Sequence, residues 1–391
     1  MADNSFTEVT HESWFSRIGG AFKGIVVGLC LVLAAFPTLF FNEGRAVTTY
    51  QSLKEGGNIV VSVPVDDVNP SNEGRLIHVT GRANTDAVLE DPVFGISANA
   101  LRLQRTVEMY QWRERSERET RTQVGGETET VTTYTYDKVW SDGVINSAEF
   151  RRSGQYQNPN AMPYQSTSYI AEPVTMGAFT LSDSLIRAID NFEPLAVAAD
   201  APLPDTLGDK GKVHDGLYYI GADPAAPQVG DVRIRFQVVT PTAVSIIAQQ
   251  LNTTFAPYQT RAGDALELLQ VGTHSAAGMI EKAQADNRFL TWILRLVGFI
   301  IMWVGLFLVL RPLVVLADVL PILGSVAGAG VGLVALLLAA PLSLVTLSVA
   351  WLFYRPLLGV ALLVGAAALT WWLMTKLKAA KDPSTPEVAT P

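Results

Sequence analysis

The feature that most constrains this chain is a long apolar block at residues 296–375. These eighty residues carry only three formal charges, on Arg311, Asp318 and Arg355. A helix needs roughly 20 apolar residues to cross about 30 Å of membrane hydrocarbon. Proline interrupts a helix because it lacks a backbone donor and restricts the residue before it. Interruptions at Pro312 and Pro356 therefore predict three membrane spans in this region, at residues 287–310, 322–353 and 356–375.

A further apolar stretch, residues 22–41, predicts a fourth span near the N-terminus. It is longer than the apolar core of a cleaved signal peptide, and no small-residue cleavage site follows it, so we expect an uncleaved anchor. Tryptophan is typical of the headgroup region, and several lie near the predicted span ends: Trp292, Trp351, Trp371 and Trp372. A modest excess of Lys and Arg favours cytoplasmic termini, with the large middle region on the opposite side.

We therefore expect a membrane protein with four transmembrane helices and one β-rich α+β extramembrane domain between the first and second spans. The predicted boundaries are a polar tail at 1–21, the first span at 22–41, the extramembrane domain at 42–286, three spans within 287–375 and a polar tail at 376–391. Residues 1–18 are expected to be loosely held.

The clearest local signal in the middle region is a long β-hairpin. Its arms are predicted at residues 100–121 and 128–140, around Gly125-Gly126, because the return arm is rich in β-branched and aromatic residues. Charges of alternating sign from Arg113 to Glu119 predict a solvated ribbon, with a docking surface as the alternative. Other strands are predicted at 59–63, 76–80, 217–220, 232–239, 243–250 and 265–271, and a short helix at 181–189.

Glycines recur at every fourth position in two predicted spans. This spacing places them on one face of a helix, where another helix can approach closely. We interpret the two faces as packing surfaces, within or between subunits. They comprise Gly20, Gly24 and Gly28 in the first span and Gly324, Gly328 and Gly332 in the third.

The tetrapeptide Asn-Glu-Gly-Arg occurs twice, at residues 42–45 and 72–75. Glycine after a carboxylate is common in turns, so each copy predicts a turn with a local ion pair. A functional site built from the two Glu/Arg pairs is the alternative. The first copy also lies in a segment without proline, through which the first helix can continue as far as Gly56-Gly57.

Composition and motifs argue against catalysis and against nucleic acid as a partner. The net charge is −8, and no Lys/Arg cluster is present. The single cysteine, Cys30, excludes an intrachain disulfide. We expect no metal, no cofactor and no catalytic residue, because the four histidines are scattered without ligand or catalytic spacing. The weakest alternative is a membrane-bound hydrolase that uses His78, His214 or His274.

Asp318 is the one acid in the C-terminal apolar block. An acid at membrane depth is a functional candidate. Because Asp318 lies between two predicted spans and close to Pro321, we expect it in an interfacial loop.

Several motifs, in the same order along the chain, resemble the transmembrane protein 43 (LUMA) family. They are Asn42-Glu43-Gly44-Arg45, Asn72-Glu73-Gly74-Arg75, Glu108-Met109-Tyr110-Gln111-Trp112, and the segment that holds Trp351, Tyr354, Arg355 and Pro356. For animal members, the resemblance implies the endoplasmic reticulum or inner nuclear membrane, a lumenal large domain, self-association, and partners in the lamin and emerin network. It supplies no catalytic residues. The short N-terminal tail and the Ala/Gly-rich spans are more similar to a bacterial member, which would lie in the inner membrane with a periplasmic domain.

We therefore expect a non-enzymatic, self-associating membrane scaffold that organises a membrane patch or a protein complex. Its expected partners are membrane lipids, further copies of itself, and other membrane or scaffold proteins. The alternative is an oligomeric channel or lipid-handling pore.

Overall fold

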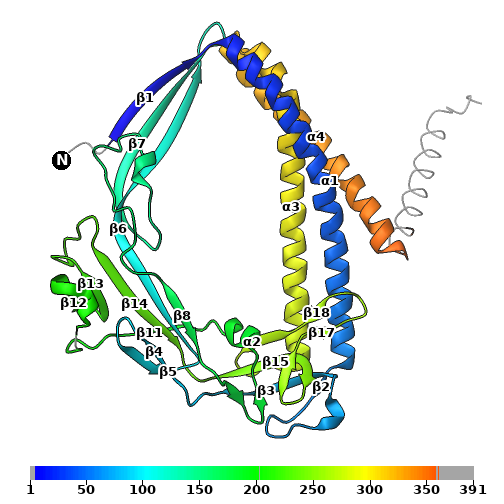
Figure 1. Ribbon diagram of the computed structural model, residues 1–391. Helices are drawn as coiled ribbons and strands as arrows, with labels where there is room; N and C mark the ends of the chain where they lie inside the picture. The colour runs from blue at the N-terminus through cyan, green and yellow to red at the C-terminus, as the bar shows by residue number, and fades with distance from the viewer. Residues whose placement is uncertain (1–4, 202, 358–359, 361–391) are drawn as a thin grey trace, which may run out of the picture. The chain divides into compact units, whose positions relative to one another are not determined.

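The computed structural model describes residues 5–201, 203–357 and 360 (Figure 1). The chain forms two compact units. The first, called the β unit here, comprises Met1–Glu12, Gln51–Thr122 and Thr128–Gln284. The second, called the helical unit, comprises Ser13–Tyr50, Gln123–Glu127 and Ala285–Pro391.

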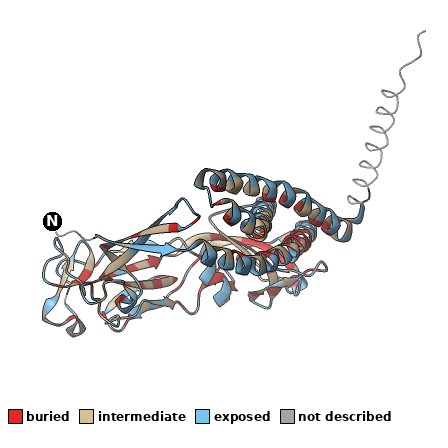
Figure 2. Cartoon of the chain, turned by 90° about the horizontal axis from the view of Figure 1, so that it is seen from above, coloured by how far each residue is buried: buried red, intermediate tan, exposed pale blue. Residues whose placement is uncertain are grey.

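Three helices in the described part of the chain are long and apolar enough to cross a membrane: α1 (Trp14–Ile59), α3 (Ala276–Ala317) and α4 (Pro321–Tyr354). Exposed residues run along all three helices (Figure 2). In the most apolar stretch of α1, α3 and α4, only 17%, 17% and 28% is buried. Such apolar faces match hydrocarbon rather than water. The β-rich domain lies between the first and second of these spans, as predicted.

The predicted limits of the spans were partly wrong. Pro312 was predicted to end a span but lies inside α3, whereas Pro341 lies inside α4, as the predicted span 322–353 already allowed. Helices of membrane proteins tolerate proline where neighbouring groups satisfy the freed backbone. Helix α1 also continues through Gly56-Gly57 to Ile59. The fourth predicted span, 356–375, lies almost entirely outside the described residues, so the structure contains three candidate spans rather than four.

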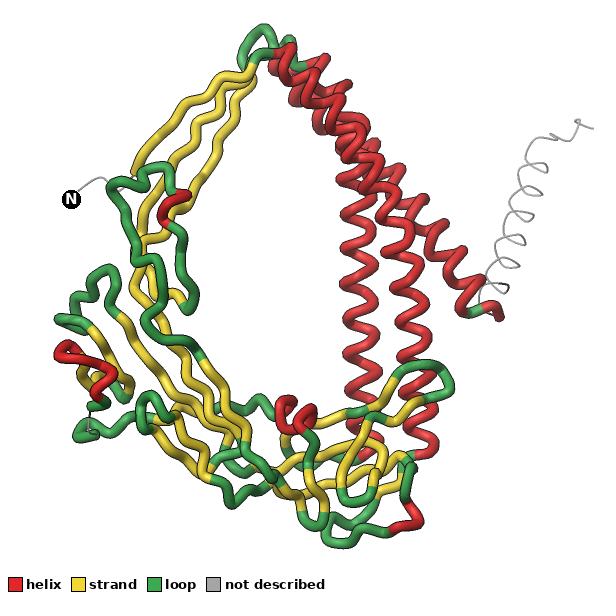
Figure 3. The backbone as a smooth tube through the Cα atoms, in the orientation of Figure 1, coloured by secondary structure: helices red, strands yellow, loops and turns green. Residues whose placement is uncertain are grey.

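The larger sheet of the β unit follows the order β1-β7-β6-β14-β13-β12, and β11 and β8 pair with β14 and β6 (Figure 3). Its strands are β1 (Ser5–Glu12), β6 (Arg102–Thr122), β7 (Thr128–Ser141), β8 (Thr167–Ile170), β11 (Glu193–Leu195), β12 (Gly211–His214), β13 (Leu217–Ile220) and β14 (Val232–Val239). The predicted hairpin is confirmed as β6 and β7, which pair antiparallel from Met109 opposite Ser141 to Thr122 opposite Thr128.

The second sheet follows the order β2-β3-β15-β16-β10-β9, with β19 beside β15. Its strands are β2 (Val61–Ser62), β3 (Leu76–Ala83), β9 (Thr175–Met176), β10 (Phe179–Thr180), β15 (Thr242–Leu251), β16 (Thr254–Ala256) and β19 (Leu268–Val271). Two-stranded pairs are formed by β4 (Val88–Asp91) with β5 (Ile96–Asn99), and by β17 (Tyr258–Gln259) with β18 (Ala265–Leu266). The short helices are α2 (Asp183–Ala188) and the 3-10 turns at Pro70–Asn72, Ser147–Glu149 and Asp205–Lys210.

Each sheet covers its own hydrophobic core. On β14 the inward residues Ile234 and Phe236 are buried at 0% and 2% exposure, while Arg235 between them is exposed. This alternation is the period of a half-buried strand, and the predicted bounds of β13 and β14 were correct. Residues 1–18 were predicted to be loose, but residues 5–12 form the edge strand β1 along β7, and α1 begins at Trp14.

Candidate functional site

The most concentrated polar chemistry in the helical unit surrounds Glu43 on α1. Its side chain is fully buried and binds two other helices. Arg295 on α3 donates to both carboxylate oxygens, with Nε–Oε1 at 2.6 Å and Nη2–Oε2 at 3.0 Å. Trp351 on α4 donates its indole N–H to Oε2 at 2.9 Å. One carboxylate therefore joins all three helices through charge-assisted hydrogen bonds, which are stronger than neutral ones.

Aromatic rings flank the cation of this pair. The guanidinium carbon of Arg295 lies 4.7 Å from the centre of the Trp292 ring and 5.8 Å from that of Trp351. A planar guanidinium can bind a carboxylate with its N–H edge while its face contacts aromatic rings. Removing either charge would leave the other buried without a partner, which is strongly unfavourable.

Arg45, two residues further along α1, forms a second polar group. It donates to the side chains of Asn287 at 2.9 Å, Thr291 at 3.1 Å and Asn42 at 3.3 Å. Asn42 donates to the Thr291 carbonyl at 3.1 Å, and Asn287 donates to the Ala46 carbonyl at 3.0 Å. Nearly every polar atom of the group is used between α1 and α3; the buried Nε of Arg45 is the exception.

Gly44 completes this tetrapeptide by its lack of a side chain. A Cβ at this position would lie 2.6 Å from the Tyr354 ring of α4. The Tyr354 ring also contacts that of Phe40, with centroids 5.1 Å apart. Half-buried Arg355 ends α4, its N–H donating to the Trp351 carbonyl at 2.7 Å, and exposed Pro356 follows. The family strings around Glu43 and Trp351 thus meet in one cluster, although about 300 residues separate them in the sequence.

Of the two predictions for residues 42–45, the continuation of the first helix is confirmed, and the turn with a local ion pair is wrong. These residues lie inside α1, and Glu43 pairs with Arg295 rather than Arg45. The error has a physical cause: glycine after a carboxylate also serves where a helix needs close approach, and packing decides between the two uses.

The second copy of the tetrapeptide forms the predicted turn, but the predicted local ion pair between Glu73 and Arg75 is not among the ion pairs of the described residues. Gly74 has a φ of +74°, which favours glycine. Exposed Glu73 accepts from the Asn252 N–H at 2.8 Å, and Arg75 donates to Asn72 at 3.4 Å. The two copies belong to different units.

The family string on β6 holds the base of the long hairpin. Glu108 binds Arg233 and Arg235 at 2.7 and 2.5 Å, and Met109 is buried. The other members are Tyr110, whose ring lies 5.1 Å from that of Trp140; Gln111, buried between Gly143 and Ile145; and Trp112, 4.8 Å from the Tyr156 ring. All five residues serve the sheet and its connections.

The predicted glycine faces differ in how closely they pack. A Cβ on Gly28 would lie 2.6 Å from the carbonyl oxygen of Gly305 on α3, so the two backbones meet there. A Cβ on Gly24 would lie 3.9 Å from the Leu308 carbonyl oxygen of α3, and a Cβ on Gly20 would have no neighbour within 4 Å among the described residues. In α4, a Cβ on Gly324 would meet Asp318 and one on Gly328 would lie 3.5 Å from Val314. A Cβ on Gly332 would have no neighbour within 4 Å among the described residues, although the Gly332 carbonyl accepts from the Trp303 indole of α3 at 3.0 Å. The role of Gly305 was not predicted, because this residue lies outside both glycine repeats.

Asp318 lies in the turn between α3 and α4, as predicted, but it is buried at 6% exposure and paired with Arg17. Arg17 also donates to the carbonyl of Gly126 at 2.5 Å, and the N–H of Gly125 donates to the Val319 carbonyl at 3.0 Å. Loop Gln123–Glu127 is therefore tied to the helix ends within the helical unit.

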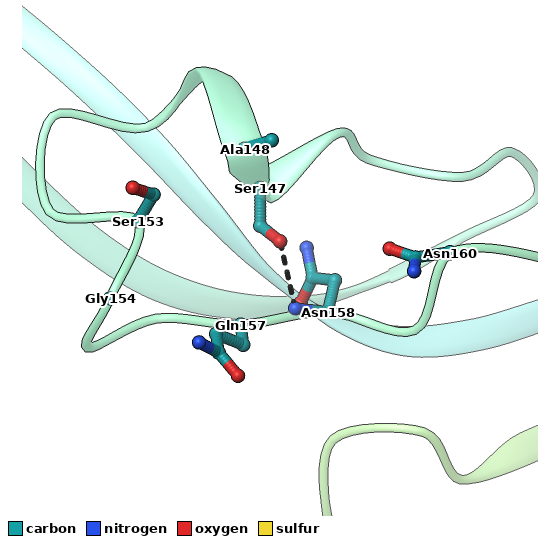
Figure 4. Close-up of a pocket in the computed structure, with 7 residues that line it drawn as sticks. All are labelled: Ser147, Ala148, Ser153, Gly154, Gln157, Asn158 and Asn160. Atoms are coloured by element: carbon teal, nitrogen blue, oxygen red, sulfur yellow. Dashed lines mark hydrogen bonds between the residues drawn. The ribbon is translucent and has the colours of Figure 1, made fainter.

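A polar pocket of about 430 Å³ lies beside the 3-10 turn Ser147–Glu149 of the β unit (Figure 4). Ser147, Ser153, Gln157, Asn158 and Asn160 line it. Asn158 bonds to the backbone N–H and carbonyl of Trp112, and its own N–H donates to Ser147 at 2.9 Å. The side chains of Asn158 and Ser147 are therefore used in hydrogen bonds that stabilise the fold.

The three histidines considered for a hydrolase lie in two places: His78 and His274 are neighbours at the second sheet, whereas His214 is on β12 of the larger sheet. Buried His78 lies beside the carbonyl of His274 at 3.0 Å and the Ser62 hydroxyl at 3.0 Å, and burial lowers the pKa of its ring. His214 is elsewhere, 3.3 Å from its exposed neighbour Asp215. The described residues include no group of three or more His, Cys, Asp or Glu side chains that could hold a metal ion.

Comparison with known proteins places these features in a family. The family profile "Transmembrane protein 43" matches residues 109–356. Mouse transmembrane protein 43 is 37% identical over 374 residues, covering 93% of this chain and 92% of its own length. The human protein is 36% identical over 380 residues, covering 94% and 93%.

A more distant relative, a Drosophila melanogaster transmembrane protein 43 homolog, is 29% identical over 367 residues and covers 90% of this chain and 94% of its own length. No solved structure matches the chain significantly. These relatives are animal proteins, so they do not support the expectation of a bacterial member. The extent and identity of the match show that this chain belongs to the transmembrane protein 43 family.

Proposed function

We propose that this protein is a non-enzymatic, self-associating membrane scaffold. The observation that carries the proposal is the commitment of the polar side chains around Glu43. Its carboxylate takes three hydrogen bonds from two helices, and Arg45 donates three more. Side chains bound in this way hold the helices at fixed positions. The Glu43 carboxylate is then fully used in binding and is not free for acid–base chemistry.

The folds of the two units suit this role. Three apolar helices supply the membrane anchor, and a fourth at 356–375 is part of the proposal. The β unit carries the larger sheet with its charged ribbon, a surface on which other proteins or further copies can dock. We propose membrane lipids, other copies and scaffold proteins as partners. The predicted orientation, with cytoplasmic termini and the large domain on the opposite side of the membrane, is not kept for the N-terminus, because β1 precedes α1 and pairs with β7 of the β unit.

Co-isolation of two differently tagged copies tests self-association. The copies are expressed together at low level, extracted in mild detergent, and recovered through one tag. We expect the second tag to be recovered with the first, and mixing of separately extracted copies serves as the control for exchange after extraction. Recovery of one tag alone from correctly folded protein would refute the scaffold.

A second function, lipid handling, is favoured by one observation. An apolar cavity of about 340 Å³ in the helical unit is lined by Trp292, Leu296 and Phe299 of α3 and by residues of α4. Arg295 also lines it, as does Ser343, whose buried hydroxyl has no hydrogen-bond partner among the described residues. Movement of fluorescent lipid between leaflets of liposomes that hold the pure protein is the test. Transfer no faster than in empty liposomes would eliminate this function.

A further inference from the structure

The outer half of β6 has one edge without a neighbouring strand. β14 pairs with β6 only from Arg102 to Met109, whereas β7 covers the opposite edge as far as Thr122. Beyond Trp112, no strand among the described residues lies on the side of β6 that faces away from β7. Residues 115–121 are exposed. Such an edge presents a row of backbone donors and acceptors that can pair with another strand.

Hydrogen bonds at the base of this edge show which residues direct their backbone N–H and C=O groups away from β7. The N–H of Tyr110 donates to the Asp231 carbonyl at 2.8 Å, so Tyr110 faces away from β7. Trp112 does the same, because its N–H and carbonyl both bond to the Asn158 side chain. Bonding directions alternate along a strand, so the backbone groups of Ser116 face the open edge as well. Asn158 occupies the position of a neighbouring strand at Trp112 and ends the free edge there.

The charges along the free edge are complementary to themselves. From Arg113 to Glu119 the chain reads Arg-Glu-Arg-Ser-Glu-Arg-Glu, so each charge has the opposite charge at equal distance on the other side of Ser116. In an antiparallel pair of two such segments with Ser116 opposite Ser116, every arginine faces a glutamate. Directly opposite unlike charges stabilise a sheet, and like charges destabilise it.

Only the register with Ser116 opposite Ser116 places every arginine opposite a glutamate. A shift by two residues places Arg115 opposite Arg115 in one direction and Glu117 opposite Glu117 in the other. A shift by one residue turns the side chains to the other face of the sheet. The backbone agrees with the same register, since two residues that both point outward, here the two Ser116, form a hydrogen-bonded antiparallel pair. An edge whose charges all had the same sign would repel a second copy in every register. The order of charges on β6 instead favours pairing with a second copy in one register.

We propose that two copies of this protein pair through the free edges of β6, antiparallel about a two-fold axis at Ser116, and so join their larger sheets into one. The partner is a second copy of this chain, and the interface is isologous because each copy contributes the same segment. The inference deepens the proposed self-association and rests on it, while naming a site that self-association alone does not require.

Charge reversal at two exposed positions tests the pairing. Arg115→Glu places Glu opposite Glu117, and Glu117→Arg places Arg opposite Arg115, so each variant alone should associate at least roughly tenfold more weakly. Mixed together, the two variants should form a heterodimer, because each reversed residue then meets the opposite charge. Arg115 is 63% exposed at its side chain, and its ion pair with Asp137 at 3.4 Å is an exposed one of small energy, so the fold tolerates the change. Full-length proteins in mild detergent, with different tags, report the pairing by co-isolation. Unchanged association of the single variants, or failure of the mixture to pair, would overturn the interface.

A cross-link gives an independent reading. With Cys30→Ser in the background, Ser116→Cys should form a disulfide dimer, because Cα atoms of a hydrogen-bonded antiparallel pair lie about 5.5 Å apart, within the range for a disulfide. Thr10→Cys, exposed on β1 at the other edge of the sheet, is the matched control and should stay uncross-linked. A multimeric protein without the Ser116→Cys dimer would refute this interface and leave the scaffold standing. A protein that is monomeric at every concentration would refute both.

Discussion

Glu43→Gln should be among the most damaging single changes in the helical unit. The substitution keeps the size of the side chain and leaves the guanidinium of Arg295 buried without a counter-charge. Glu43 is fully buried, and the Arg295 side chain is 15% exposed. Breaking one half of a buried ion pair typically costs about 3–5 kcal/mol. At about 2 °C per kcal/mol for a large domain, the unfolding temperature should fall by roughly 6–10 °C.

The assay is thermal loss of the helical circular dichroism signal in mild detergent. Glu73→Gln is the matched control, because it makes the same change in the same tetrapeptide at an exposed turn. Its effect should stay within about 0.5 kcal/mol. In a double-mutant cycle, Arg295→Gln should add little to Glu43→Gln, since the two changes remove one interaction. Glu43→Gln protein that unfolds at the wild-type temperature would refute the role given to this ion pair.

Two further predictions concern helix packing and pH. Gly28→Ala should destabilise the helical unit by about 1–3 kcal/mol, because the new Cβ would lie 2.6 Å from the Gly305 carbonyl oxygen. Gly20→Ala is the control: its Cβ would have no neighbour within 4 Å among the described residues, so it should be neutral in the same thermal assay. Burial, and then the hydrogen bond to Glu114, raise the pKa of Tyr136 to about 12 from its ordinary 10.0. The unfolded chain loses this proton first, so stability should fall as pH rises from 10 towards 12. Tyr136→Phe should flatten that fall in urea unfolding, and an unchanged slope would contradict the assignment.

Local patterns predicted the elements that local patterns control. The alternation in residues 232–239 sets the bounds of β14, and the turn at Gly125-Gly126 sets the hairpin of β6 and β7. Both signals lie within a few residues of the structure they specify. Where the surroundings decide, prediction was weaker: Pro312 was expected to end a helix, yet α3 continues through it to Ala317.

The two Asn-Glu-Gly-Arg copies show the limit most clearly. Residues 72–75 form the predicted turn, whereas residues 42–45 lie within a helix. The difference depends on Arg295 and Trp351, which meet Glu43 from 252 and 308 residues away. A single sequence holds no signal for contacts at such separation, and tertiary packing overrides local preference. Gly305 was missed for the same reason, since only its contact with Gly28 shows its role.

The mass of the purified protein, measured by light scattering in mild detergent with the detergent mass subtracted, tests the proposed scaffold most directly. One chain has a mass of 42.3 kDa. We expect a discrete multiple of this value that persists on dilution and shrinks in Arg115→Glu protein. A single species at the mass of one chain, from protein with wild-type helical content, would contradict self-association and the function built on it.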